Sequence, residues 1–168
     1  SIRRRVAELG ADGKLLLNDK GEIARVTLFE KVLTLSLAKL SNYVPDGGIW
    51  LNTQRPEWND ANNALVGNGL SMVTVCYLHR WSQFMHDWVA STGMQETVVS
   101  LNVARFFRET LKVLLENEPS VDGLMSPSAR ERMTELLSQA GSDYRERLYR
   151  EGLSHETTTI SSDECLRF

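Results

Sequence analysis

Apolar residues recur at steps of three and four along most of the chain, which is the spacing of one face of an α-helix. The clearest runs predict main helices at residues 23–42, 70–90, 98–117 and 128–151. A shorter helix is predicted at residues 2–9, and the polar run at residues 155–162 is interpreted as a loop or terminus. The pattern predicts an all-α protein built of helical hairpins.

The predicted helix at residues 70–90 is apolar around most of its circumference. One stripe contains Leu70, Val73, Tyr77, Trp81, Phe84 and Trp88, and a second set contains Met72, Val75, Cys76, Leu78, Met85 and Val89. A helix of this kind is expected to be buried on several sides. We therefore expect it to be the most buried element, with Trp81 and Trp88 in the core.

The next two predicted helices have a polar side. In the helix at residues 98–117, Phe106 and Phe107 lie on the apolar face while Arg105 and Lys112 lie on the other, as expected of a helix in an outer layer. The helix that follows begins either with Ser126 as its N-cap or through a capping box. The capping-box residues are Ser128 and Glu131, and Gly141 is a candidate break farther along.

Charge and length limit the partners that we expect. A chain of 168 residues fits a single helical domain. Its 19 basic and 22 acidic residues are mixed along the sequence, so no strong field attracts nucleic acid or an anionic membrane. The longest apolar run, at residues 70–78, is too short to span a bilayer. We expect neither nucleic acid nor a membrane as a partner.

Metal binding and secretion leave no clear signal in the sequence. Cys76 and Cys165 have no metal-ligand spacing, and His79 and His86 lie seven residues apart without a suitably placed carboxylate, so no metal site is predicted. Residues 8–22 lack the apolar core of a signal peptide, and localisation stays open. The chain has no initiator methionine and no polar tail, so we expect it to be part of a longer catalytic domain.

The main chemical signal lies in a long connection at residues 44–69, which is rich in Asn, Gly and Pro. Loops of this length inside compact domains are uncommon unless they bind something or are disordered, and we interpret this one as an active-site loop. A carboxylic acid can protonate a glycosidic oxygen, an indole packs on a sugar ring, and amides bind hydroxyls. The candidate residues are Arg55, Glu57, Trp58, Asn59, Asp60, Asn62 and Asn63.

The segment Glu57-Trp58-Asn59-Asp60 resembles the Asp-Trp-Asn-Asp segment of the cellobiose and chitobiose phosphorylase family, whose catalytic domain is an (α/α)6 toroid. Glu57 stands where the family has its first aspartate. The resemblance implies that Asp60 is the general acid and that Trp58 lines the sugar subsite. It further implies that the chain is a fragment of such a toroid, with a carbohydrate substrate, no cofactor, and inorganic phosphate as co-substrate if the enzyme is a phosphorylase.

The same residues have other interpretations. Asp60 also fits the N-cap of a following helix, Trp58 also fits packing beneath a loop, and the asparagines Asn62 and Asn63 also fit turns. If Asp60 is the acid, it must be protonated near neutral pH, and a charge on Glu57 would raise the pKa of Asp60.

Three functions therefore remain open. They are a glycoside hydrolase or phosphorylase, a noncatalytic sugar-binding helical domain, and a helical scaffold or interaction module. The last would be marked by an exposed apolar helix face and by the lack of a pocket at Trp58.

Overall fold

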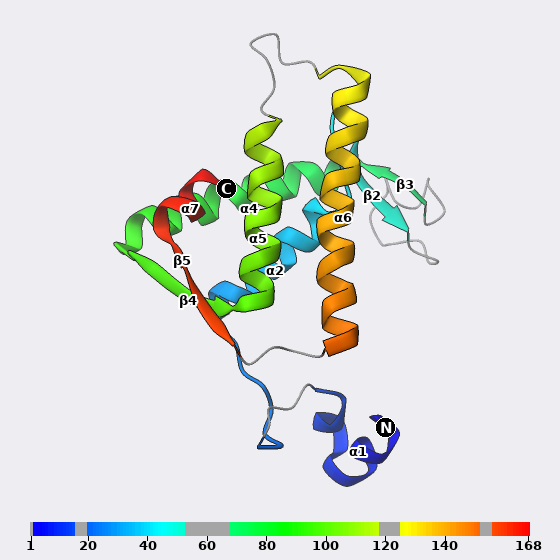
Figure 1. The fold of residues 1–168 in the computed structure, drawn as a ribbon, viewed down its shortest axis with the longest axis vertical. Helices are drawn as coiled ribbons and strands as arrows, with labels where there is room; N and C mark the ends of the chain where they lie inside the picture. Colours follow the sequence, from blue (N-terminus) through cyan, green and yellow to red (C-terminus); the bar gives the residue numbers. More distant parts are fainter. Residues whose placement is uncertain (1, 16–19, 53–67, 118–124, 152–155) are drawn as a thin grey trace.

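The computed structural model describes residues 2–15, 20–52, 68–117, 125–151 and 156–168. Most of these residues are helical, as predicted, and two small antiparallel sheets accompany the helices (Figure 1). The helices are α1 (Ile2–Leu9), the 3₁₀ helix η1 (Gly10–Lys14), α2 (Leu28–Leu40), α4 (Met72–Thr92), α5 (Leu101–Glu116), α6 (Pro127–Glu151) and α7 (Ser162–Arg167). The strands are β1 (Tyr43–Val44), β2 (Gly48–Asn52), β3 (Asn68–Ser71), β4 (Glu96–Ser100) and β5 (Thr157–Ser161).

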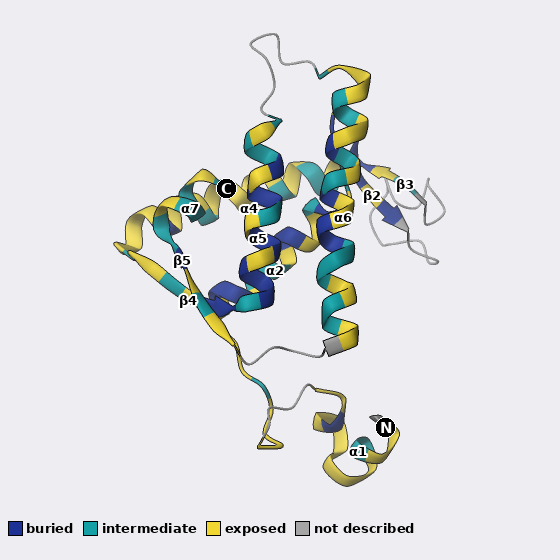
Figure 2. Ribbon diagram, viewed as in Figure 1, coloured by how far each residue is buried: buried dark blue, intermediate teal, exposed yellow. Residues whose placement is uncertain are grey.

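Helix α5 lies at the centre of the molecule. It runs beside α6 and also packs against α2, and its buried residues form much of the core (Figures 1 and 2). Phe106 and Phe107 are almost completely buried, and Phe106 stacks on Tyr144 of α6 with ring centroids 4.8 Å apart. Arg105, Arg108 and Lys112 on its polar side are exposed, as expected, while its apolar face contributes more to the core than an outer-layer helix was expected to.

Helix α4 is the outer element instead. Val89 is its only residue in the buried class among those described, while Trp81 and Trp88 remain 39 % and 37 % exposed. The strip that contains Met85 and Val89 packs on the core, and Trp88 touches it through one face by stacking on Phe29. The expectations that this helix is the most buried element and that both tryptophans are core residues are wrong. An apolar circumference shows what a helix can bury, but it does not show that neighbours cover it.

Several predicted helices begin too early because a strand or an extended segment leads into them. Residues 23–27 precede α2 without being helical, and Thr27 caps that helix by accepting the Glu30 N–H at 3.1 Å. Strand β3 includes Leu70 and ends at Ser71, which caps α4. Strand β4 occupies residues 96–100, where the pattern predicts the start of the next helix. Apolar spacing continues through each junction and hides the change.

The described part of the C-terminal polar run is not a loop. Residues 157–161 form β5, which pairs antiparallel with β4 in a register that sets Thr97 opposite Ile160. Ile160 is fully buried against the core, and Ser161 opens α7 through a capping box with Glu164. Threonine and isoleucine are common in strands, but the partner strand is far away in the sequence, so the local pattern does not show the pairing.

Helix α6 begins as one of the two predicted alternatives. The Oγ of Ser126 accepts the N–H of Ala129 at 3.2 Å, so Ser126 is the cap. The helix continues through Gly141 without a break. A Cβ atom at that position would lie 2.5 Å from the Cβ of Ser41, so the glycine lets α6 approach the end of α2 closely.

The N-terminal helix α1 has the predicted bounds and packs with η1, apart from the rest of the molecule (Figure 1). Most of its described side chains are exposed (Figure 2). In the ranges that the structure describes, no helix is both long and apolar enough to cross a membrane.

Candidate functional site

The predicted site lies between two paired strands. Strands β2 and β3 run antiparallel, with Ile49 opposite Ser71 and Asn52 opposite Asn68. The backbone therefore leaves the sheet at Asn52 and returns directly beside it at Asn68. All seven predicted site residues fall within 53–67: Arg55, Glu57, Trp58, Asn59, Asp60, Asn62 and Asn63. They lie outside the described residues, so their roles stay predictions.

Close backbone packing holds the base of this hairpin. Gly48 has a φ of 148°, and a Cβ atom there would lie 3.0 Å from the backbone carbonyl of Ser71. Only glycine fits this position without strain. The N–H of Trp50 donates to the carbonyl of Asn42 at 2.7 Å, which ties β2 to the end of α2. The strands on either side of the candidate segment are therefore well anchored.

The hairpin leads directly into α4. Ser71 is the last residue of β3, and its Oγ accepts the N–H of Thr74 at 3.2 Å and lies 2.9 Å from the Thr74 hydroxyl. A side-chain cap of this kind satisfies one of the free N–H groups of the first turn. As a result, the candidate segment ends only a few residues before the N-terminus of a 21-residue helix.

The other side of the sheet rests on α6. Arg130 Nη1 lies 3.7 Å from Oδ2 of Asp46, which occupies the turn between β1 and β2. Burial, and to a lesser extent the nearby Asp46 carboxylate, raises the pKa of Tyr43 above its usual value. Tyr43 therefore keeps its proton at neutral pH and remains a hydrogen-bond donor.

A shallow groove runs between α2 and α4, starting close to the first turn of α4. Its volume is about 230 Å³, and it is lined by Leu35, Ser36, Lys39, Thr74, Tyr77, Leu78 and Trp81. The indole N–H of Trp81 donates to the Oγ of Ser36 at 3.2 Å, which holds the ring against α2. The lining is mostly apolar, with Lys39 as its charged member, and this makes the groove better suited to apolar contact than to sugar hydroxyls.

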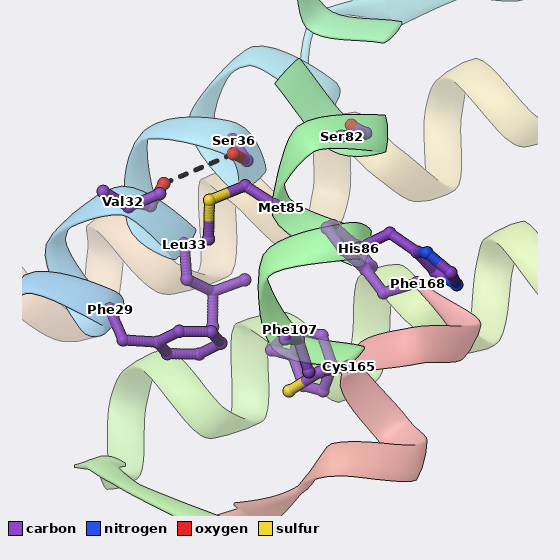
Figure 3. Close-up of a pocket in the computed structure, with 11 residues that line it drawn as sticks. Phe29, Val32, Leu33, Ser36, Ser82, Met85, His86, Phe107, Cys165 and Phe168 are labelled. Carbon is purple, nitrogen blue, oxygen red and sulfur yellow. Dashed lines mark hydrogen bonds between the residues drawn. The ribbon is translucent and has the colours of Figure 1, made fainter. Parts of the chain in front are cut away.

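A smaller cavity of about 50 Å³ lies deeper, where α2, α4, α5 and the C-terminal residues meet (Figure 3). Figure 3 shows Phe29, Leu33 and Met85 around it, with His86 pointing away from the α2 side. The Cys165 thiol also lines the cavity, and burial, together with the Glu164 carboxylate, raises its pKa to about 11. Because the thiolate is the reactive form, Cys165 is poorly suited to nucleophilic chemistry at neutral pH.

Comparison with known proteins adds no family. No protein-family model matches the chain, and no curated protein matches it.

The structure exposes aromatic side chains of α4 that the sequence pattern assigned to the core. The outer side of α4 carries exposed Tyr77 and Phe84, 66 % and 57 % exposed, next to the partly exposed Trp81. The rings of Trp81 and Phe84 lie 5.6 Å apart. The sequence signal was present as an apolar stripe with no charge in it, but the spacing alone does not separate a buried stripe from an uncovered one. An exposed apolar helix face is one of the two marks expected of a helical scaffold or interaction module; the other, at Trp58, lies outside the described residues.

Proposed function

We propose that this chain is part of a carbohydrate-active enzyme, a glycoside hydrolase or phosphorylase, in which Asp60 is the general acid. The match of Glu57-Trp58-Asn59-Asp60 to a known catalytic segment carries the proposal. The largely helical fold and the well-anchored strands on either side of the segment support it. We propose further that the helices form part of an (α/α)6 toroid in the full natural polypeptide.

In this proposal the neutral carboxyl of Asp60 donates its proton to the glycosidic oxygen as the bond to the anomeric carbon breaks. Water or inorganic phosphate attacks that carbon. Trp58 stacks on the sugar, Glu57 supplies negative charge that keeps Asp60 protonated, and polar neighbours bind hydroxyls. These neighbours are Arg55, Asn59, Asn62 and Asn63. An inverting hydrolase also needs a second carboxylate about 6.5 to 9.5 Å away to activate water.

The test is turnover by the Asp60→Asn variant of the full natural polypeptide. Asparagine cannot donate the proton, so cleavage of an alkyl glycoside should fall by about 10² to 10⁴-fold. A dinitrophenyl glycoside, whose leaving group needs no proton, should be far less affected at the bond-breaking step. Asp12→Asn, on the exposed 3₁₀ helix η1, is the matched control and should leave both rates unchanged.

Other results of these turnover and binding measurements would change the assigned function. Full activity of Asp60→Asn on both substrates would remove Asp60 from the mechanism, and equal losses in a folded variant would give it a positioning role. Sugar binding without any turnover by the unmodified protein would favour the noncatalytic sugar-binding domain. Turnover that requires inorganic phosphate would identify a phosphorylase.

A second function is favoured by a separate observation, the exposed apolar side of α4. Monomeric soluble proteins rarely leave a continuous patch of large apolar side chains uncovered unless it binds something. We propose that this side of α4 is an interaction surface, with or without the chemistry at Asp60.

A further inference from the structure

Four aromatic residues form a continuous row on the outer side of α4, which we term the aromatic stripe: Tyr77, Trp81, Phe84 and Trp88. They follow one another at steps of four, three and four, so they keep to one side of the helix as in a helix–helix seam. Their exposed fractions are 66, 39, 57 and 37 %. No charged residue interrupts the row.

The stripe is held in a fixed shape. Trp81 is anchored to Ser36 by its indole N–H, and Trp88 stacks on Phe29 with ring centroids 6.1 Å apart. Tyr77 and Phe84, the more exposed pair, alternate with these anchored rings. A partner would therefore meet a preformed surface, and little ordering would be needed to bind it.

The edges of the stripe differ in charge. Arg80 and Asp87 flank it on one side, each directly before a tryptophan and seven residues apart, so they share one edge. Both are exposed, and Asp87 Oδ1 lies 3.3 Å from His86 Nδ1. Leu78 and Met85 flank the opposite side, which faces the body of the molecule. Within the stripe's own helix, only this edge carries charges, one of each sign, while Lys39 of α2 lines the groove beside the other edge.

The aromatic stripe and its charged edge are self-complementary when two copies of α4 pack antiparallel. Suppose that Trp81 packs against Phe84 of a second, antiparallel copy. Tyr77 then packs against Trp88 of that copy, because the midpoint of residues 77 and 88 is also the midpoint of residues 81 and 84. Along the flanking edge, the same register brings Arg80 opposite Asp87 of the second copy. Two-fold symmetry repeats this ion pair at the other end of the contact.

The available surface suits such a contact in size. Val73 on α4 and Leu35 on α2 extend the exposed apolar surface beside the stripe. Scaling typical side-chain areas by the exposed fractions gives apolar surface on the order of 600 Å² on each copy, somewhat below the roughly 800 Å² that each partner contributes to a standard interface.

We propose that α4 is the interface of a symmetric dimer of this chain, with the two stripes packed antiparallel and two Arg80–Asp87 ion pairs between the copies. The inference rests on the second function proposed above, the interaction surface, and is independent of the chemistry at Asp60. The partner that the surface fits is a second copy, because the antiparallel two-fold arrangement packs the stripe on itself and pairs Arg80 with Asp87 at both ends.

The test measures self-association of the 168-residue chain by sedimentation velocity over a range of concentrations. The unmodified chain should dimerise, and Phe84→Asp should abolish the dimer by placing a charge in the apolar seam. Arg80→Glu and Asp87→Arg should each raise the dissociation constant by at least about tenfold, because each creates two like-charge pairs. The double variant reverses every pair and should return close to the unmodified value.

Arg132→Glu, a charge reversal on the exposed side of α6, is the matched control and should leave the dimer unchanged. Circular dichroism of each variant separates lost association from lost folding. A chain that stays monomeric at about 100 μM, or a dimer insensitive to Phe84→Asp, would overturn the proposal. A folded double variant that remains as weak as the single variants would overturn the antiparallel register. Turnover assays of Asp60→Asn are read separately, so failure of one proposal is not mistaken for failure of the other.

Discussion

Glu30 is a buried acidic residue with a structural task. It lies in the first turn of α2 and is only 6 % exposed. One carboxylate oxygen accepts the hydroxyl of Ser100 at 2.6 Å, and the other accepts the Ser100 N–H at 3.1 Å. Ser100 precedes α5 and makes no side-chain cap bond of its own; instead, its hydroxyl and its N–H both donate to Glu30. A negative charge at this end of α5 also opposes the positive end of the helix dipole.

We therefore predict that Glu30→Gln lowers the free energy of unfolding by about 1 to 3 kcal/mol, the usual range for a hydrogen bond to a charged group. Glutamine keeps the size of the side chain and removes its charge. Urea unfolding at neutral pH measures the change. Glu131→Gln, at an exposed position on α6, should change stability by less than about 0.5 kcal/mol. Similar small changes in both variants would mean that Glu30 contributes little to the link between α2 and α5.

At the scale of elements, one ion pair fastens α7 to α5. Arg108 Nε donates to Glu164 Oε1 at 2.7 Å, and Arg108 Nη2 donates to the carbonyl of Thr159 at 2.9 Å. Glu164 also accepts the N–H of Ser161 at 2.9 Å as part of the capping box. A single carboxylate thus joins a strand end, a helix start and the central helix.

These contacts make stability depend on pH in a defined direction. The hydrogen bond from Arg108, helped by Ser161, holds the pKa of Glu164 at about 2, below the usual 4.5. The stabilisation is complete above about pH 4.5 and is lost as the pH falls toward 2, because the unfolded chain takes up the proton first. We predict that Glu164→Gln reduces the fall in stability across this window.

The change in the free energy of unfolding across this pH range should differ between the two proteins by on the order of 1 kcal/mol, since Arg108 and Glu164 are both partly exposed to solvent. Urea titrations at several pH values between 2 and 6 measure it. Glu116→Gln breaks the exposed Lys112–Glu116 pair on α5, the helix that carries Arg108. It serves as the control and should leave the pH dependence of stability unchanged. Parallel curves for unmodified protein and Glu164→Gln would contradict the prediction.

Elements were predictable where the apolar spacing had no competing signal. The bounds of α1 and α6 follow directly from it, and Ser126 was one of two named caps. Strand β5 was not predictable in the same way, because its five residues are stabilised by β4, more than fifty residues away. The junctions were missed for a related reason: Ser71 and Ser100 each end a strand and start a helix, and apolar residues lie on both sides of them.

At the scale of the whole molecule, the burial of α4 was predicted wrongly. Helix α5 keeps an exposed polar side with Arg105 and Lys112, and its apolar face contributes much of the core, while the more apolar α4 is mostly exposed. A periodic pattern identifies the side that can be buried, and only tertiary packing decides which sides are covered. For the candidate site, the residues are predicted from the sequence alone. The structure adds that Asn52 and Asn68, on either side of them, pair across two strands.

This strand pair leads to a prediction about folding. Replacing residues 53–67 by a two-residue Asn-Gly turn should preserve the helical circular dichroism, because the turn suits an antiparallel hairpin and the ends already lie together. The shorter loop should leave the free energy of unfolding unchanged or raise it by about 1 to 2 kcal/mol. Thermal and urea unfolding measure both properties.

Leu51→Ala, at a buried position in β2, is the comparison and should cost about 2 to 5 kcal/mol. Loss of cooperative unfolding in the shortened chain would mean that residues 53–67 belong to the folding unit. If the shortened chain folds, it should lack any turnover that depends on Asp60 and should still dimerise through α4.

Because Asn52 and Asn68 are neighbours across two strands, the chain between them begins and ends at nearly the same point in space. Insertions and deletions between these two residues change the length of the connecting segment and leave the rest of the fold in place. Each doubling of the segment's length costs only about 0.6 kcal/mol of loop-closure entropy. Natural variants of this protein could therefore differ greatly in this segment while sharing the same helices. Under the proposed function, the residues that contact the sugar all lie in this segment, so they would vary independently of the sequence positions that maintain the fold.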